Sequence, residues 1–498
     1  MLHSIINKPV SNRLRLGSRR LGILTILVCA SACPVHGDPP SSTSTTIGFD
    51  SDPGWEGFRN RLLPESRPIV RQDFGYSQTN HAGGQRPGEI GGVVHRAQPR
   101  AYYAMAIPTL SFNDRFSASG KFAVTSADGS SGVLIGWFHE TSEGWRTPNS
   151  FMFRMDGNGG KYWVFYEYGT RSWATAGVGA FEGERYQTTP TKPYPADGTV
   201  HDWSLAYDPD AWQGQGRMTF RIDDHIYQLP LSPGHKEDGV VLNRFGILNQ
   251  QTPGSHLEVY LDDLVIGGQE VSFDEDPVWV EEANRVTYKQ RFIRPHHDIG
   301  YTQTENAGGA RGEIGGIMFR DEQPAYFADR VGPFSLDHKL LASGTIALCS
   351  AGSDSGVFLG WFSAAEKRNK TDPEYVSRQT DYVGVMIEGP SRKGHYFRAG
   401  YSTSKGRGSA PTGEGSAENE RSLILPDRSI HQWSLQYDPE GSSGSGRIRV
   451  VFDDVVRDLD LNPGERAEGA VLDRFGFFDI QVGGHHVELY VDDLTYSK

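Results

Sequence analysis

The chain has 498 residues, of which 22% are charged and 11% aromatic, and it contains 60 glycines and 28 prolines. This density of turn-forming residues favours many short strands over long helices. The formal net charge is −13, which argues against nucleic acid as the main partner because binding a polyanion requires a basic surface.

The first 37 residues have the features of a secretory signal peptide. Five basic residues precede the apolar run LGILTILVCA at 21–30, which is too short to span a membrane. Cleavage after Ala32 or Gly37 fits the small residues that follow, and loss of 37 residues leaves 44 basic against 62 acidic residues, a net charge of −18. Ser31-Ala32-Cys33 also resembles a lipoprotein box, in which Cys33 would be lipidated. We expect a secreted, periplasmic or cell-surface protein without a transmembrane segment in its mature chain.

Two copies of one long unit follow. FDSDPGW at 49–55 recurs as FDEDPVW at 273–279, and SGVLIGWF at 131–138 recurs as SGVFLGWF at 355–362. Further on, HDWSLAYDP at 201–209 matches HQWSLQYDP at 431–439. The offset of 224 to 230 residues is far longer than that of a solenoid repeat. We therefore predict a duplicated domain, with copies at 47–268 and 273–498.

Large apolar residues alternate with small or polar ones inside each copy, as in WSLAY at 203–207 and LEVYL at 257–261. This period of two is typical of strands with one buried face. Turn signals such as Asp208-Pro209 and Pro233-Gly234 separate these runs. The predicted fold class is all-β, with two tandem antiparallel β-sandwich domains of the jelly-roll type.

The tryptophan motifs carry a family resemblance. HDWSLAYDP followed by GRMTFRIDD, HQWSLQYDP followed by GRIRVVFDD, and the closing YLDDLVI and YVDDLTY resemble strands of laminin G-like domains in the concanavalin A-like superfamily. The resemblance implies a jelly roll with one concave sheet, in a superfamily that includes lectins, glycosidases and polysaccharide lyases. The choice among these functions depends on the site.

A glycine-rich motif also recurs in both copies. GYSQTNHAGGQRPGEIGG at 75–92 matches GYTQTENAGGARGEIGG at 300–316 at 13 of 17 aligned positions. Strand alternation puts Glu89, Val93 and His95 on one face and Ile90 and Val94 on the other. Two interpretations remain open here: a sugar subsite in which glycine leaves room for the ring, or a bulge in which the glutamates form structural ion pairs with arginines.

The motif supplies the candidate site residues. Because His81 becomes Asn306 and His95 becomes Phe319 in the second copy, histidine catalysis would be confined to the first domain. The catalytic candidates are Tyr76, His81, Glu89 and His95. The ligand-binding candidates are Tyr76, Gln78, Arg86, Glu89, Tyr301, Gln303, Arg311 and Glu313.

Paired aspartates suggest a structural Ca²⁺, a hard cation that takes several oxygen ligands. Jelly rolls of the resembled superfamily often bind calcium near their first and last strands. The resemblance therefore implies Asp50 with Asp262, and Asp274 with Asp492, as metal ligands.

A second resemblance is to jelly-roll alginate lyases. HYFRAGYS at 395–402 is similar to their YFKAG motif, and RGEI at 311–314 to their Arg-x-Glu motif. Those enzymes neutralise a uronate and remove its α proton with a histidine base and a tyrosine acid. Their Gln-Ile-His motif is absent, since the corresponding strand reads GVFLGWF at 356–362, and the first copy reads KYWVFYEYG in place of YFRAG.

Aromatic residues divide into two sets. We expect Trp137, Trp203, Trp361 and Trp433 in the cores, because they lie in apolar strands. Those that lie among turns would be free to stack on sugar faces: Trp145, Trp163, Tyr166 and Tyr168.

These observations favour an exported tandem jelly-roll protein that binds a polysaccharide or surface glycan, with duplication providing avidity. The alternatives are a polysaccharide lyase or glycosidase with its site in the first domain, and a structural cell-envelope or adhesion protein without a small ligand.

Overall fold

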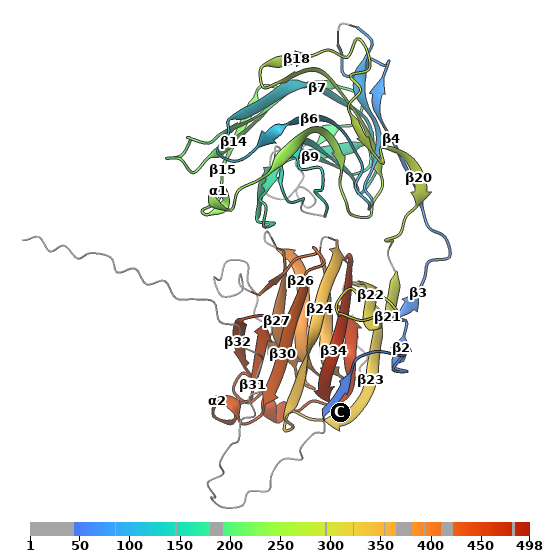
Figure 1. Ribbon diagram of the computed structural model, residues 1–498, viewed down its shortest axis with the longest axis vertical. Coiled ribbons are helices and arrows are strands. Elements are labelled where there is room, and N and C mark those ends of the chain that lie inside the picture. Colours follow the sequence, from blue (N-terminus) through green and yellow to red (C-terminus); the bar gives the residue numbers. More distant parts are fainter. Residues whose placement is uncertain are drawn as a thin grey trace, which may run out of the picture. The chain divides into compact units, whose positions relative to one another are not determined.

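The computed structural model describes residues 44–84, 86–144, 147–179, 193–293, 296–321, 323–352, 354–364, 381–391, 394–409, 422–480 and 484–498. These residues form two β-sandwiches, each made of two antiparallel sheets (Figure 1). The predicted all-β class with two tandem sandwich domains is confirmed.

The first sandwich pairs a nine-stranded with an eight-stranded sheet among the described residues. The nine-stranded sheet has the order β15 (His225–Pro230), β14 (Arg217–Ile222), β13 (Val200–Asp208), β7 (Phe116–Ala127), β17 (His256–Ile266), β5 (Glu89–His95), β4 (Ile69–Ser77) and β20 (Arg285–Lys289), with β18 (Gln269–Val271) paired to β17. The eight-stranded sheet has the order β11 (Thr175–Gly179), β10 (Lys161–Gly169), β9 (Ser150–Gly157), β8 (Ser131–Phe138), β16 (Leu242–Asn249), β6 (Tyr102–Leu110) and β19 (Val280–Glu282), with β12 (Tyr194–Pro195) paired to β10.

The second sandwich repeats this arrangement over its described residues. Its nine-stranded sheet has the order β3 (Arg61–Leu62), β21 (His297–Thr302), β22 (Glu313–Phe319), β34 (His486–Ser497), β24 (Leu340–Ala351), β30 (Ile430–Asp438), β31 (Arg447–Phe452) and β32 (Val455–Asp460), with β1 (Ser44–Ile47) paired to β34. Its eight-stranded sheet has the order β2 (Glu56–Phe58), β23 (Tyr326–Phe334), β33 (Leu472–Asp479), β25 (Ser355–Phe362), β26 (Tyr382–Ser391), β27 (Gly394–Ser402) and β28 (Gly408–Ser409), with β29 (Leu423–Ile424) paired to β27.

Helical structure within the described residues is limited to single turns between strands. These are α1 (His235–Asp238), α2 (Gly441–Gly444) and a 3₁₀ turn, η2 (Arg466–Glu468).

The period-two pattern explains how the cores form. In β13, Trp203, Leu205 and Tyr207 are buried, while the residues between them are more exposed. Each sandwich encloses one large apolar cluster between its sheets. The four tryptophans expected in the cores are all buried there, which confirms that prediction.

The opening segments of the two copies are exchanged. We call residues 44–62, with β1, β2 and β3, the first closing segment, and residues 269–289, with β18, β19 and β20, the second closing segment. The first closing segment pairs with β34, β23 and β21 of the second sandwich. The second pairs with β17, β6 and β4 of the first sandwich. Figure 1 shows β2 and β3, in blue, beside β23 and β21. The sandwiches therefore differ from the sequence copies 47–268 and 273–498 at these segments.

Candidate functional site

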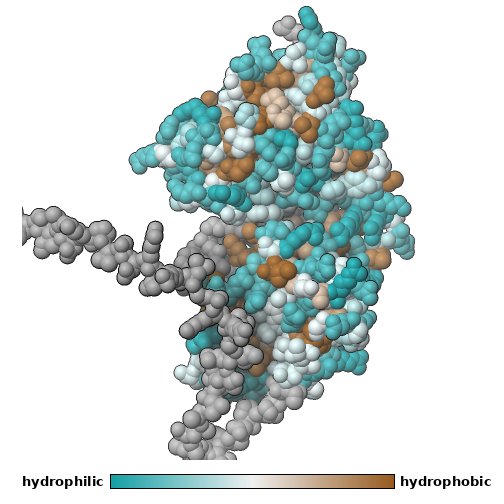
Figure 2. Space-filling model, in the orientation of Figure 1, coloured by the Kyte–Doolittle hydropathy of each residue, from teal (hydrophilic) through white to brown (hydrophobic). Residues whose placement is uncertain are grey.

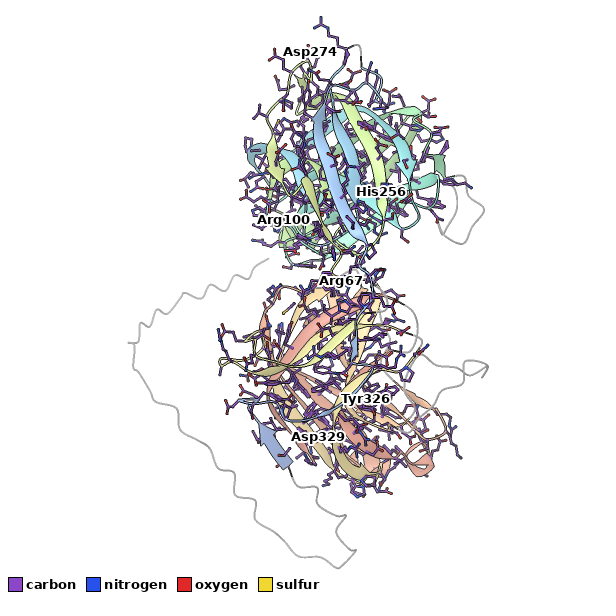
Figure 3. The ribbon with its side chains drawn as sticks, turned by 90° about the vertical axis from the view of Figure 1, so that its right-hand side faces the viewer. Arg67, Arg100, His256, Asp274, Tyr326 and Asp329 are labelled. Carbon is purple, nitrogen blue, oxygen red and sulfur yellow. The ribbon has the colours of Figure 1, made fainter. Side chains whose placement is uncertain are left out.

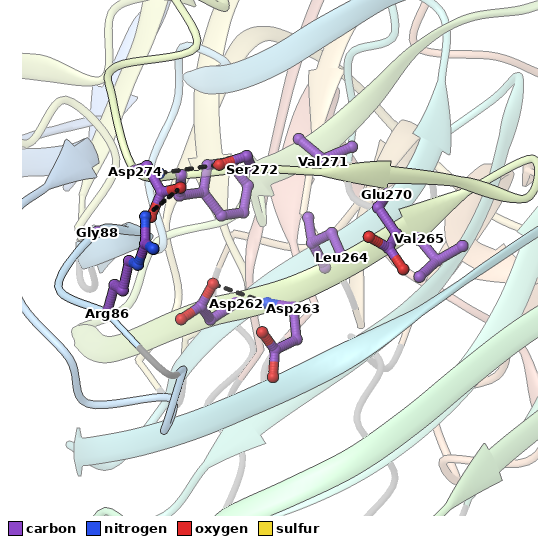
Figure 4. A pocket seen from close by; sticks show the side chains of 11 residues that line it. Arg86, Gly88, Asp262, Asp263, Leu264, Val265, Glu270, Val271, Ser272 and Asp274 are labelled. Atoms are coloured by element: carbon purple, nitrogen blue, oxygen red, sulfur yellow. Dashed lines mark hydrogen bonds and ion pairs between the residues drawn. The ribbon is translucent and has the colours of Figure 1, made fainter.

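An open pocket of 720 Å³ lies in the first sandwich, beside the hairpin of β17 and β18 (Figure 4). It is formed by the loop before β5, by the end of β17 and by the second closing segment. Polar side chains dominate its lining, and Leu264, Val265, Val271 and Phe273 supply the apolar part. The polar lining residues are Arg86, Asp262, Asp263, Glu270, Ser272 and Asp274.

A β-bulge in β17 sets the acidic side of the pocket. The register with β7 shifts between Asp262 and Val265, and Asp263 adopts a left-handed φ of 50°. The Asp263 amide donates to Oδ1 of Asp262 at 2.7 Å. Aspartate tolerates this conformation better than most residues. The Asp-Asp pair therefore bends the strand where the pocket opens.

Asp262 is 6% exposed and lies against the glycine-rich loop. A Cβ built on Gly84 would lie 1.7 Å from its Oδ2 atom, so only glycine fits there. Burial raises the pKa of Asp262, and the charges of Asp263 and Glu89 raise it further, while the hydrogen bond from the Asp263 amide and the charge of Lys121 oppose this effect. Gly84 thus makes room for the Asp262 carboxylate, which packs against the loop backbone at the edge of the pocket.

The second closing segment supplies the opposite wall. Oδ2 of Asp274 lies 3.3 Å from Nη1 of Arg86, and both side chains are more than half exposed. The Asp274 amide donates to Oγ of Ser272 at 3.2 Å. Arg86, a predicted ligand-binding residue, thus meets Asp274 and Asp262, two predicted metal ligands, at one pocket.

Glu89 and Glu313 hold their own loops. Both carboxylates are fully buried. Glu89 accepts the backbone amides of His81 and Ala82, each at 2.8 Å. Glu313 accepts the amides of Asn306 and Ala307 at 2.9 and 2.7 Å, and also the Thr304 hydroxyl at 2.6 Å. Of the two interpretations of the motif, this geometry favours the structural one, with backbone amides rather than arginines as the partners.

The glycines of the motif allow close backbone approach. A Cβ on Gly91 would lie 2.1 Å from the Val259 carbonyl oxygen, and a Cβ on Gly88, at φ 132°, would lie 1.9 Å from the carbonyl oxygen of Phe273. Gly312 has the same relation to Phe49, at 2.0 Å. The glycines therefore accommodate neighbouring strands and the closing segments.

The remaining binding candidates are dispersed. Tyr76 and Tyr301 pack toward the cores, on the face of the sheet opposite to the buried glutamates. Gln78, Gln303 and Arg311 are exposed. The eight candidates therefore do not converge on one site, and of them only Arg86 lines the pocket.

The catalytic candidates are also separated. His81 is exposed and stacks on Tyr260, with ring centroids 4.2 Å apart. His95 lies at the other end of β5 from Glu89, about 20 Å away along an extended strand. There it stacks on His256, which is labelled in Figure 3, and its Nδ1 contacts the Arg71 carbonyl at 2.8 Å. Burial lowers the pKa of His95.

The lyase-like motifs lie on different sheets of the second sandwich. Glu313 begins β22 in the nine-stranded sheet, whereas Tyr396 is in β27 of the eight-stranded sheet. Phe397 packs into the core between the sheets, so Tyr396 is on the outer face of its sheet. The structure does not bring the two motifs together.

The aspartates lie near one another in a different pairing from the one that the resemblance implies. Asp274 shares the pocket with Asp262, and the charge of Asp50 acts on Asp492, whose pKa is raised chiefly by burial. Over the described ranges, no group of three or more histidine, cysteine or acidic side chains is arranged to hold a metal ion. Calcium stays a prediction.

Two of the aromatic residues expected to stack on sugars are core residues. Tyr166 and Tyr168 are buried in the cluster of the first sandwich, because β10 continues through them and turns them inward. Trp163 is 6% exposed, and Trp145 lies outside the described residues. The polar pocket residues that the sequence analysis missed are Asp263, Glu270 and Ser272. Of these, only Asp263 carried a recognisable signal, because it belongs to an Asp-Asp pair.

The face of the molecule in Figure 2 is largely hydrophilic, with hydrophobic residues scattered over it. None of the helices in the described part of the chain has the length and apolar character needed to cross a membrane.

Comparisons with known proteins give distant structural matches only. No protein-family model and no curated protein matches the chain. Among solved structures, domains LG4-5 of the mouse laminin α1 chain align with 86% of this chain and 90% of their own, at 10% identity and a TM-score of 0.22.

Two further structures cover about one sandwich each. The exolytic alginate lyase AlyA5 from Zobellia galactanivorans aligns over 44% of this chain and 96% of its own, at 13% identity and a TM-score of 0.27. Arcelin-5, a lectin-like defence protein from Phaseolus vulgaris, aligns over 40% and 90%, at 11% identity and a TM-score of 0.23. The families that the sequence motifs resemble are thus among the matches, and similarity of this extent does not indicate a shared activity.

Proposed function

We propose that this protein is an exported glycan-binding protein and that the pocket beside β17 and β18 is its carbohydrate site. The observation that carries the proposal is the meeting of Arg86, Asp262 and Asp274 around an open polar cavity of 720 Å³. Ligand sites typically enclose about 300–1,000 Å³. Carboxylates accept hydrogen bonds from sugar hydroxyls and a guanidinium donates them, so this lining suits a polyhydroxylated ligand.

The charge of the lining narrows the ligand class. Four carboxylates line the pocket against one guanidinium, Arg86, which is already paired with Asp274. A uronate would meet net repulsion there, while a neutral or amino sugar would not. We therefore propose a neutral or amino-sugar polysaccharide, displayed outside the cell, as the partner.

Binding is favoured over catalysis by the separation of the catalytic candidates. A general acid and a base must both reach the reacting atoms. Tyr76 lies on the core face, Glu89 is fully buried, and His95 is at the far end of its strand. No pair of these groups flanks the pocket.

A glycan array with the full chain and the Asp274→Ala variant tests this function. We expect bound neutral or amino sugars to be lost in the variant, because a pocket carboxylate and the partner of Arg86 disappear together. Asp210→Ala is the matched control, since its side chain is 84% exposed and does not line the pocket. Retention of all sugars by the Asp274 variant, or no sugar bound by the wild type, would overturn the proposal. New absorbance at about 235 nm on incubation with uronate polysaccharides would instead reveal a lyase.

A further inference from the structure

The second sandwich is completed by a segment that precedes the whole first sandwich in the sequence. Its strands β21 to β34 lie between residues 297 and 497, whereas β1, β2 and β3 lie between residues 44 and 62. All of the first sandwich lies between them in sequence. Residues 63–68 are the whole connection from β3 to β4.

Apolar contacts hold the first closing segment in the core of the second sandwich. Phe49 is 1% exposed and Trp55 is 8% exposed. The Trp55 ring lies 5.7 Å from Phe327 and 5.9 Å from Tyr496, centroid to centroid. These rings come from β23 and β34, one in each sheet. The segment therefore fills a groove between the two sheets.

Polar contacts add register and selectivity. The Asn60 side chain donates to the Ile299 carbonyl at 2.7 Å, and the Ile299 amide donates back to the Asn60 carbonyl at 3.0 Å. Glu56 accepts the hydroxyl of Tyr326, labelled in Figure 3, at 2.8 Å. Glu56 also accepts from Arg330 at 2.7 Å and Arg474 at 3.0 Å.

The second closing segment makes equivalent contacts in the first sandwich. Trp279 stacks on Tyr103 at 5.7 Å. Asn284 donates to the Phe74 carbonyl at 2.6 Å and its carbonyl accepts the Phe74 amide at 3.1 Å. One difference stands out, because Val280 occupies the position of Glu56. Two segments from different parts of the chain, which share the F-D-x-D-P-x-W pattern, thus bind two equivalent grooves.

We propose that the second sandwich carries a peptide-binding groove, and that its ligand is a segment of the F-D-x-D-P-x-W type supplied here by residues 44–62. The groove holds this segment by strand pairing and by two aromatic anchors, as in β-strand addition. The covalent link through residues 63–68 is not needed for recognition, so the groove accepts the same peptide as a separate molecule, including the N-terminal segment of a second copy. Glu56 makes the groove selective for this segment over residues 269–289.

The test uses the full chain with a protease recognition sequence placed within residues 63–68. After folding and cleavage, the chain is unfolded in urea, separated from the released N-terminal fragment, and refolded with an excess of a fluorescent peptide of residues 44–62. We expect one labelled peptide per chain, and none on the uncleaved chain, whose own segment occupies the groove. Melting of the second sandwich is recorded in parallel.

Peptide variants distinguish specific binding in the groove from nonspecific association of the peptide with the chain. A Trp55→Ala peptide loses an aromatic anchor, and we expect its uptake to fall by at least about tenfold. A peptide of residues 269–289 lacks the carboxylate of Glu56 and should also be taken up less. Equal uptake of the Trp55→Ala peptide would overturn the proposal. So would a cleaved chain that refolds without any peptide and melts like the uncleaved chain.

Discussion

Asp479 allows a test of how the burial of a carboxyl affects the stability of the second sandwich. This carboxyl is fully buried in β33. Its Oδ1 accepts the Ala325 amide at 2.9 Å, and its Oδ2 is buried with no hydrogen-bond partner among the described residues. Burial is the main cause that raises its pKa well above the usual value. The first copy has Asn249 at this position, which accepts the Ala101 amide at 2.8 Å and donates to two carbonyls.

We expect Asp479→Asn to stabilise the second sandwich at pH 7. An unsatisfied buried polar group costs about 1–3 kcal/mol, and one regained hydrogen bond contributes about 1 kcal/mol. The expected gain is therefore about 2–4 kcal/mol, or a rise in Tm of roughly 4–16 °C for a domain of this size. The gain should shrink as the pH falls toward 4, because a group with a raised folded-state pKa costs stability only above its unfolded pKa.

Calorimetry of the full chain at several pH values measures this effect. The mirror variant Asn249→Asp is the control, since it should lower the transition of the first sandwich and leave that of the second unchanged. An Asp479→Asn protein with unchanged or lowered stability at pH 7 would refute the reasoning, because it would mean that the native carboxylate is neutralised by an interaction worth as much as its desolvation.

Four further predictions concern other positions in the two sandwiches. Glu89→Gln should destabilise the first sandwich by about 1–2 kcal/mol and speed hydrogen exchange of the loop amides that the carboxylate binds; unchanged exchange would contradict the structural role. Gly88→Ala should cost more than about 2 kcal/mol, since its Cβ would meet a carbonyl oxygen at 1.9 Å, whereas Gly129→Ala, with open space around it, should be nearly neutral in urea unfolding. Burial lowers the pKa of His395 to about 3, so the unfolded chain gains a proton below pH ~6.5 that the folded chain does not, and stability should fall by about 2 kcal/mol by pH 5; His395→Asn should flatten this slope. Added Ca²⁺ should raise the Tm and a chelator lower it, and an unchanged Tm would count against the calcium prediction.

Strand-level features followed from local pattern. The alternation in residues 203–207 correctly placed Trp203 in the core, and the face assignment of β5 was confirmed because Ile90 and Val94 pack into the cluster of the first sandwich. These predictions needed only the two-residue period of a strand. Tyr166 and Tyr168 were predicted wrongly as sugar-stacking residues, because neighbouring turn signals concealed a continuous strand.

The candidate site depended on information that is not local. Glu89 is a carboxylate in a polar, glycine-rich motif and therefore looked like a binding residue. Its partners are instead two backbone amides of the loop that precedes it. Arg86 is far from Asp262 and Asp274 in sequence, and it meets them only because a bulge and a closing segment converge on its loop. No spacing rule connects such positions.

The duplication, the all-β class and many of the inward-facing residues could be predicted from the sequence, because a repeat and a strand period are local patterns. Which sandwich each closing segment joins could not be predicted in this way. FDSDPGW and FDEDPVW fit equivalent grooves through equivalent contacts, so their local patterns cannot distinguish the two partners. The pairing of β1 with β34 is settled by long-range strand contacts and by how the chain connects them, and the same exchange sets Asp274, rather than Asp50, beside Asp262.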